Sequence, residues 1–349
     1  RFFMRKVHLF SIILALAVSH IASAQGRSIN KIVDNNSLND GEIQKIKRYA
    51  EFWSSALETT DGESLNNARK KLADPLEPSV GMTLYARSIY GNALKENIDQ
   101  YLAADGVNEM AAVNALQVVS LLGTEEGCAI LQNHADIMTE KRASLRLWSS
   151  IGLKNTFQIG VLNVRKIKST AKLVATFIIK ESDWFIISRQ FDTLASIKDV
   201  PGLDKQAIEE MGIASFELQS TALATLLSDI NTGDGADARV QALPIILPSL
   251  LLQFSESGVD DRSGDDAKEI ILPELIAFVE TSTSQAPSIE ANPVLNSAYK
   301  EGVAIASIMI NYILEQNAEN SVTIVDLWEN GNVDAIQECV KTWKKLSKN

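Results

Sequence analysis

Histidine, cysteine and aromatic residues are scarce in this chain of 349 residues, which has three His, two Cys and 6% Phe, Tyr and Trp. Two of the histidines precede residue 25, which leaves His134 for any site in the rest of the chain. One His and two Cys fall short of the usual zinc ligand set. Nucleophilic catalysis is also disfavoured, because no G-x-S-x-G elbow occurs and Cys128 and His134 fall on different helix faces.

Glycine-rich phosphate-binding motifs are absent too. The sequence has no G-x-x-x-x-G-K-[ST] and no G-x-G-x-x-G after a strand, so nucleotide cofactors are not indicated. Acidic residues outnumber basic ones, 44 against 33, for a net charge of −11. Such a surface repels nucleic-acid phosphates and anionic membranes. We therefore expect no nucleic-acid partner and no cofactor.

The apolar run at the N-terminus, Val7 to Val18, is too short to span a bilayer. It follows Arg5 and Lys6 and precedes Ala22-Ser23-Ala24, which is the pattern of a secretory signal peptide. We predict a signal peptide over residues 1–24 and export to the periplasm or the extracellular space. After its removal we expect no membrane insertion.

Export bears on the two cysteines, Cys128 and Cys339, which could form one disulfide in an oxidising compartment. The favoured alternative is two separate buried thiols, because each cysteine falls within an amphipathic helical pattern.

Helical periodicity is the dominant feature that the chain does have, and it is clearest between Met110 and Leu153. Apolar residues recur there every three positions, at Val113, Leu116, Val119 and Leu122. Gly123 is expected to end this helix in a left-handed conformation. Thr124 is expected to cap the next helix, and Thr139 a third.

Two helices joined by such a short turn lie nearly antiparallel and need neighbours to bury their apolar stripes. The stretch 110–153 resembles a HEAT- or armadillo-type repeat, on the residues Ala115-Leu116, Leu121-Leu122-Gly123-Thr124 and Ala129-Ile130-Leu131. This resemblance implies stacked antiparallel helix pairs in an α-α superhelix, whether open or closed; an irregular helical bundle is the alternative. It also implies a protein-interaction or scaffold module.

Helical patterns continue along the chain, so we predict an all-α fold. We expect a flexible lead-in over 25–39, an N-terminal helical-repeat half over 40–200 and a C-terminal helical half over 201–349. Pro201-Gly202 marks the boundary between the halves. Asp183 and Asn292-Pro293 are predicted helix starts.

One short internal repeat supports stacked helices. Ile246-Leu247-Pro248-Ser249-Leu250 and Ile271-Leu272-Pro273-Glu274-Leu275 share Ile-Leu-Pro-x-Leu, although coincidence remains the alternative. A proline within an apolar helical run kinks or restarts the helix.

Two charged groups are candidate sites. The acidic loop with Asp260, Asp261, Asp265 and Asp266 could bind Ca²⁺, although a solvated loop is the favoured interpretation. A basic face formed by Arg165, Lys166, Lys168 and Lys172, with Lys154 nearby, could dock an acidic partner or an anionic glycan. A solvated helix face is again the favoured interpretation.

With no catalytic constellation evident, we predict a binding protein with an unidentified protein partner rather than an enzyme. The alternative is a carboxylate-dependent glycan hydrolase on an α/α toroid, which would need clustered acids and an exposed tryptophan in one cleft. Four tryptophans (Trp53, Trp148, Trp184 and Trp343) occupy core-like helical positions, and Trp328 is less defined. A groove of mixed polar residues without a convergent pocket would favour the binding protein.

Overall fold

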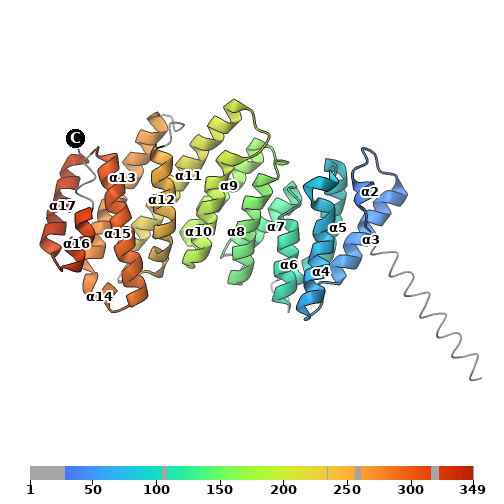
Figure 1. Ribbon diagram of the computed structural model, residues 1–349, viewed down its shortest axis with the longest axis horizontal. Coiled ribbons are helices and arrows are strands. Elements are labelled where there is room, and N and C mark those ends of the chain that lie inside the picture. Colours follow the sequence, from blue (N-terminus) through green and yellow to red (C-terminus); the bar gives the residue numbers. More distant parts are fainter. Residues whose placement is uncertain (1–27, 104–107, 234, 256–260, 316–321, 349) are drawn as a thin grey trace, which may run out of the picture. The chain divides into compact units, whose positions relative to one another are not determined.

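The computed structural model describes residues 28–103, 108–233, 235–255, 261–315 and 322–348 (Figure 1). Over these ranges the chain forms α-helices joined by turns and short 3₁₀ helices, and none of the described residues lies in a β-strand. The predicted all-α fold is confirmed. The chain divides into two compact units, Arg1–Leu131 (unit 1) and Gln132–Asn349 (unit 2).

In unit 1, helices that are two apart in chain order pack against each other. α3 packs on α5 and α4 on α6, while consecutive helices also contact each other. The elements are α2 (Asn30–Val33), α3 (Asp40–Ser55), α4 (Gly62–Ala73), η1 (Asp74–Leu76), η2 (Pro78–Val80), α5 (Leu84–Leu102), α6 (Glu109–Val119) and α7 (Glu125–Ala135), whose last turn belongs to unit 2.

Residues 28–39, which belong to the expected flexible lead-in, include the short helix α2 and two buried side chains. These are Ile29, which precedes α2 as its N-cap, and Val33, its last residue. The Thr83 amide donates a hydrogen bond to the Val33 carbonyl at 2.9 Å. α2 also contacts η1 and η2, so a short apolar pair is enough to anchor this segment. Residues 25–27 lie outside the described ranges.

Unit 2 repeats the packing of alternate helices over a longer stretch. α8 packs on α10, α9 on α11, α11 on α13, and α15 on both α12 and α13. The elements are α8 (Ala143–Gln158), α9 (Val164–Lys180), α10 (Trp184–Ala195), η3 (Ser196–Asp199), α11 (Lys205–Thr232), η4 (Ala238–Ala242), α12 (Leu243–Ser255), α13 (Asp261–Ser284), α14 (Ala286–Glu290), α15 (Pro293–Ile313), α16 (Val322–Glu329) and α17 (Val333–Leu346).

Most of the local helix signals are confirmed. Gly123 has φ +63°, and the Thr124 hydroxyl accepts a hydrogen bond from the Gly127 amide at 3.1 Å. Asp183 caps α10, and Asn292 caps α15 with Pro293 as its first residue. Each cap satisfies backbone N–H groups that the first helical turn leaves without a partner.

Thr139 is the exception, because it does not cap the following helix. α8 starts at Ala143 after Arg142, without a side-chain cap. The Thr139 hydroxyl instead contacts the Asn133 carbonyl and, at 3.1 Å, the Asp136 carbonyl, at the end of α7. The conformation of the α7–α8 turn therefore gives this hydroxyl a partner in the preceding helix.

The Pro201-Gly202 turn lies inside unit 2 and joins two packed helices, while the division between units falls in α7. Gly202 reverses the chain with φ +80°. The apolar residues on both sides of the turn remain buried in one core, as at Val200 and Met211. The two Ile-Leu-Pro segments lie within the continuous helices α12 and α13. None of the helices in the described ranges is long and apolar enough to cross a membrane.

Candidate ligand-binding groove

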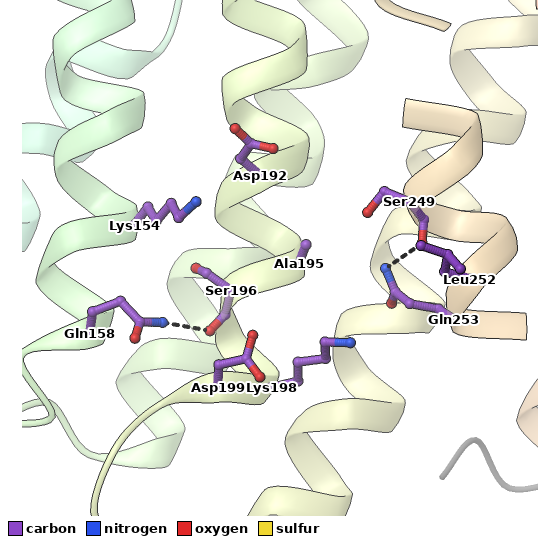
Figure 2. A pocket seen from close by; sticks show the side chains of 10 residues that line it. All are labelled: Lys154, Gln158, Asp192, Ala195, Ser196, Lys198, Asp199, Ser249, Leu252 and Gln253. Carbon is purple, nitrogen blue, oxygen red and sulfur yellow. Dashed lines mark hydrogen bonds between the residues drawn. The ribbon is translucent and has the colours of Figure 1, made fainter. Parts of the chain in front are cut away.

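A groove of about 540 Å³ lies in unit 2 between α8, the α10–η3 segment and α12. We call it the α10 groove. Its walls combine charged, amide, hydroxyl and apolar side chains from segments that are about a hundred residues apart in the sequence (Figure 2). The lining residues are Lys154, Gln158, Asp192, Ala195, Ser196, Lys198, Asp199, Ser249, Leu252 and Gln253.

Polar contacts in the core hold α10 against α8. The Thr193 hydroxyl donates to the Ser150 carbonyl at 2.9 Å, and Thr193 is completely buried. Closer to the groove, Gln158 Nε2 donates to the Ser196 carbonyl at 3.1 Å (Figure 2). The buried Ile197 anchors η3, and Asp199 lies exposed at its end.

The opposite wall, α12, is fixed by a buried amide pair. Gln219 on α11 and Gln253 on α12 exchange two hydrogen bonds, 3.0 and 3.3 Å long. Phe216 and Phe254 pack edge to face with ring centroids 4.7 Å apart. A buried amide pair has little rotational freedom. The outward face of α12, which carries Leu252 with 64% of its surface exposed, is therefore well positioned.

The charges of the α10 groove are unequally compensated. Asp192 is paired with Arg189 one turn earlier on α10 at 2.7 Å, and that guanidinium also lies 4.8 Å from the centre of the Phe185 ring. Lys154 projects from α8 toward α10 (Figure 2). It has no ion-pair partner in the described part of the chain.

The predicted basic face does not form this groove. Arg165 and Lys172 are exposed on α9 and Lys166 is half-buried, while Lys168 pairs with Glu210 of α11 at 3.2 Å. Lys154, which the sequence placed only near these residues, lies instead in the groove. No local pattern identifies Lys154 as a groove residue, because α10 and α12 complete its surroundings.

The acidic loop offers no assembled cation site in what the structure describes. Asp260 and the Asp261 side chain lie outside the described residues. Asp265 and Asp266 are exposed on α13, and Asp265 pairs with Lys268 at 3.2 Å. Across the described ranges, no group of three His, Cys, Asp or Glu side chains could hold a metal ion.

The two cysteines do not form a disulfide in this structure. Cys128 is buried in α7 and Cys339 is half-buried on α17. Burial, together with the neighbouring Glu338 carboxylate, raises the pKa of the Cys339 thiol. A raised pKa leaves less reactive thiolate at neutral pH.

A buried charge network at the α7–α8 turn has no counterpart among the sequence predictions. His134 belongs to this network, and its Nδ1 lies 2.9 Å from Glu140 Oε2. The Glu140 carboxylate also accepts hydrogen bonds from the Arg142 backbone amide and guanidinium. Burial would raise the pKa of Glu140, but these hydrogen bonds and the Arg142 charge lower it to about 2.

A second ion pair next to this network joins α8 to the α9–α10 turn. Arg146 donates to both Glu181 oxygens at 2.7 and 3.1 Å, and both residues are buried. Arg146 also donates to the Glu140 and Lys141 carbonyls, while Glu181 accepts from the Ser182 and Asp183 amides. With their donors and acceptors occupied in this way, the two residues support the fold rather than a reaction.

No known protein family matches the chain, and no curated protein sequence matches it at a significant level. The function therefore has to be argued from the α10 groove and its surroundings.

Proposed function

We propose that this protein is a helical binding module that holds a polypeptide partner in the α10 groove. One observation carries the proposal: a concave surface of mixed polar and apolar side chains, supported from behind by hydrogen bonds between buried residues. Binding sites are typically concave, with a few well-placed polar groups on an apolar base. Stacked helix pairs that resemble HEAT repeats present such surfaces to protein partners, although this analogy is at the level of the fold.

The same surface gives less support to a glycan hydrolase. That chemistry needs two carboxylates, one of which has a raised pKa so that it can act as the acid. The α10 groove has two carboxylates, but Asp192 is held by Arg189 at 2.7 Å and Asp199 lies exposed to solvent, so neither has the apolar surroundings of such an acid. None of the five tryptophans lines the groove, and Trp328 and Trp343 are buried. The stacking platform of a sugar cleft is therefore missing from its walls.

A pull-down that compares two exposed substitutions tests the binding proposal. Ser249→Trp places an indole inside the α10 groove, whereas Thr176→Trp adds the same ring to the exposed surface of α9, outside it. We expect the unmodified protein and Thr176→Trp to retain the same partner, and Ser249→Trp to lose it. Equal retention by both variants would exclude the groove as the binding site.

Export remains part of this proposal and has its own test. If residues 1–24 are a signal peptide, the protein recovered from the exported fraction should begin at Gln25. N-terminal sequencing of that fraction would show it, and a retained apolar run would contradict the prediction.

A further inference from the structure

We propose that the occupant of the α10 groove is an extended segment that carries an acidic side chain within about five residues of an aliphatic or aromatic one. This inference rests on the proposed function and specifies the chemistry of the partner. It follows from the placement of Lys154 on one wall and Leu252 on the other.

Four charged residues line the groove: Lys154, Asp192, Lys198 and Asp199. Asp192 is paired with Arg189, and Lys198 already has an interaction of its own. Lys154 is the cation that has no ion-pair partner in the described part of the chain, so it is the position at which a ligand carboxylate is favoured, away from the exposed Asp199. Its ammonium group projects into the groove (Figure 2). In a protein of net charge −11, an unpaired ammonium group in a concave surface favours a carboxylate at that position.

Leu252 provides the apolar contact on the opposite wall. Ile245 and Leu252 are seven residues apart on α12, which puts them on the same face, and they are 42% and 64% exposed. Ile245 lines a smaller hollow that shares Asp192, Ala195 and Ser249 with the groove. Ile245 and Leu252 are therefore two exposed apolar side chains on one face of α12, on either side of Ser249, and Leu252 is the one that lines the groove and can contact an apolar side chain of a partner.

The groups between the two walls suit an extended backbone. Gln158 uses its Nε2 atom for the Ser196 carbonyl, which leaves its Oε1 atom to accept a hydrogen bond from a peptide amide. Ser249 is exposed on the facing wall, and its hydroxyl can donate to a peptide carbonyl. These groups match the alternating donors and acceptors of a main chain.

The span of the groove limits the spacing of the two side chains. Packed neighbouring helices lie about 8–10 Å apart, so the axes of α8 and α12, on either side of α10, are about 18 Å apart. Lys154 extends from α8 toward α10 (Figure 2), so the distance that a ligand bridges is shorter than this. An extended chain advances about 3.3 Å per residue, so at most about five residues separate the two ligand side chains.

Selection from a display library of random twelve-residue peptides tests the inference. The unmodified protein, Lys154→Glu, Leu252→Ser and Ser249→Trp are used as baits, with Lys172→Glu on α9 as the matched charge control. All four positions that change carry exposed side chains, and thermal unfolding checks that each bait is folded. We expect the unmodified protein and Lys172→Glu to enrich acidic peptides with an apolar residue within about five positions.

The variants separate the contributions of the two walls. Lys154→Glu should abolish the preference for acidic peptides. It should also lower the affinity for the selected peptides about fivefold, as expected for the loss of an exposed ion pair. Leu252→Ser should remove the apolar preference and weaken binding about tenfold.

Two negative results can be told apart. If peptides are enriched and lost with Ser249→Trp, but show no acidic preference that depends on Lys154, this inference is wrong and the proposed function stands. If no peptide is enriched, or Ser249→Trp binds as well as the unmodified protein, the groove does not bind polypeptide and both proposals fail.

Discussion

Unit 1 and unit 2 consist of similar helices, yet they use different polar groups in their interiors. In unit 1, three tyrosine hydroxyls donate to backbone carbonyls: Tyr49 to Lys71, Tyr90 to Leu72 at 2.8 Å, and Tyr101 to Ser54 at 3.1 Å. Burial raises the pKa of all three phenols, so they remain neutral donors. These bonds need no charge in the interior.

Unit 1 also buries the Arg87 guanidinium, which donates to the Leu121 and Leu122 carbonyls at 2.8 and 2.9 Å. Unit 2 differs because it buries an ion pair between two side chains, together with an amide pair. Arg146 and Glu181 join α8 to the α9–α10 turn, and Gln219 and Gln253 join α11 to α12. A buried ion pair requires all of its partners, because the loss of one leaves an uncompensated charge. The comparison therefore predicts that unit 2 is the more sensitive of the two to single substitutions and to acid.

Removal of one partner of the buried ion pair should have the largest effect. Arg146→Met leaves the Glu181 charge without its guanidinium and should lower the free energy of unfolding by about 3–5 kcal/mol. Urea unfolding followed by tryptophan fluorescence measures this, because four of the five tryptophans lie in unit 2. The double variant Arg146→Met/Glu181→Leu should recover part of the loss. A double variant no more stable than the single one would contradict this account.

The next largest effect is expected at a turn of unit 2. Gly160 has φ +72°, and a Cβ atom there would lie 2.8 Å from the Pro201 carbonyl oxygen. Gly160→Ala should therefore cost about 2–3 kcal/mol, from left-handed strain and the clash. Gly81 of unit 1 is the matched control, because it has φ +69° and no atom within 4 Å of the added Cβ. Equal losses at the two glycines in thermal unfolding would show that the contact with Pro201 is unimportant.

The charge network predicts a pH dependence specific to unit 2. The pKa of Glu140 is about 2 in the folded protein, below its ordinary value of 4.5. A lowered pKa stabilises the fold above pH 4.5, and this contribution disappears as the pH falls toward 2. Glu140→Gln should cost about 2 kcal/mol at pH 7 and progressively less below pH 4.5. Urea unfolding at a series of pH values would show whether the free energies of unfolding of Glu140→Gln and the unmodified protein converge at low pH. A difference that stays constant with pH would argue against this account.

The smallest effect is expected in unit 1. Tyr90→Phe removes one neutral hydrogen bond and leaves the Leu72 carbonyl without that donor, at a cost of about 1 kcal/mol. Tyr85→Phe, at a residue that is 54% exposed, should change the stability little. If Tyr90→Phe lowered the free energy of unfolding as much as Arg146→Met does, unit 2 would not be the more sensitive of the two units.

Local features of the sequence were sufficient for the helices and many of their ends. Gly123, Thr124, Asp183 and Asn292 act within one turn of their own position, so the neighbouring residues determine the outcome. Thr139 shows the limit of this reasoning, because contacts around the α7–α8 turn give its hydroxyl a different partner. The same limit explains the packed α2, since Ile29 and Val33 are too few to form a recognisable pattern.

The all-α class, the acidic charge and the amphipathic helices were determined by the sequence alone, because they depend on composition and on interactions three or four residues apart. The α10 groove was decided by tertiary structure. Lys154, Asp192 and Leu252 belong to three helices, and only the packing of α8, α10 and α12 brings them to one surface. The buried Arg146–Glu181 pair has the same origin, since 35 residues separate two side chains that meet at 2.7 Å.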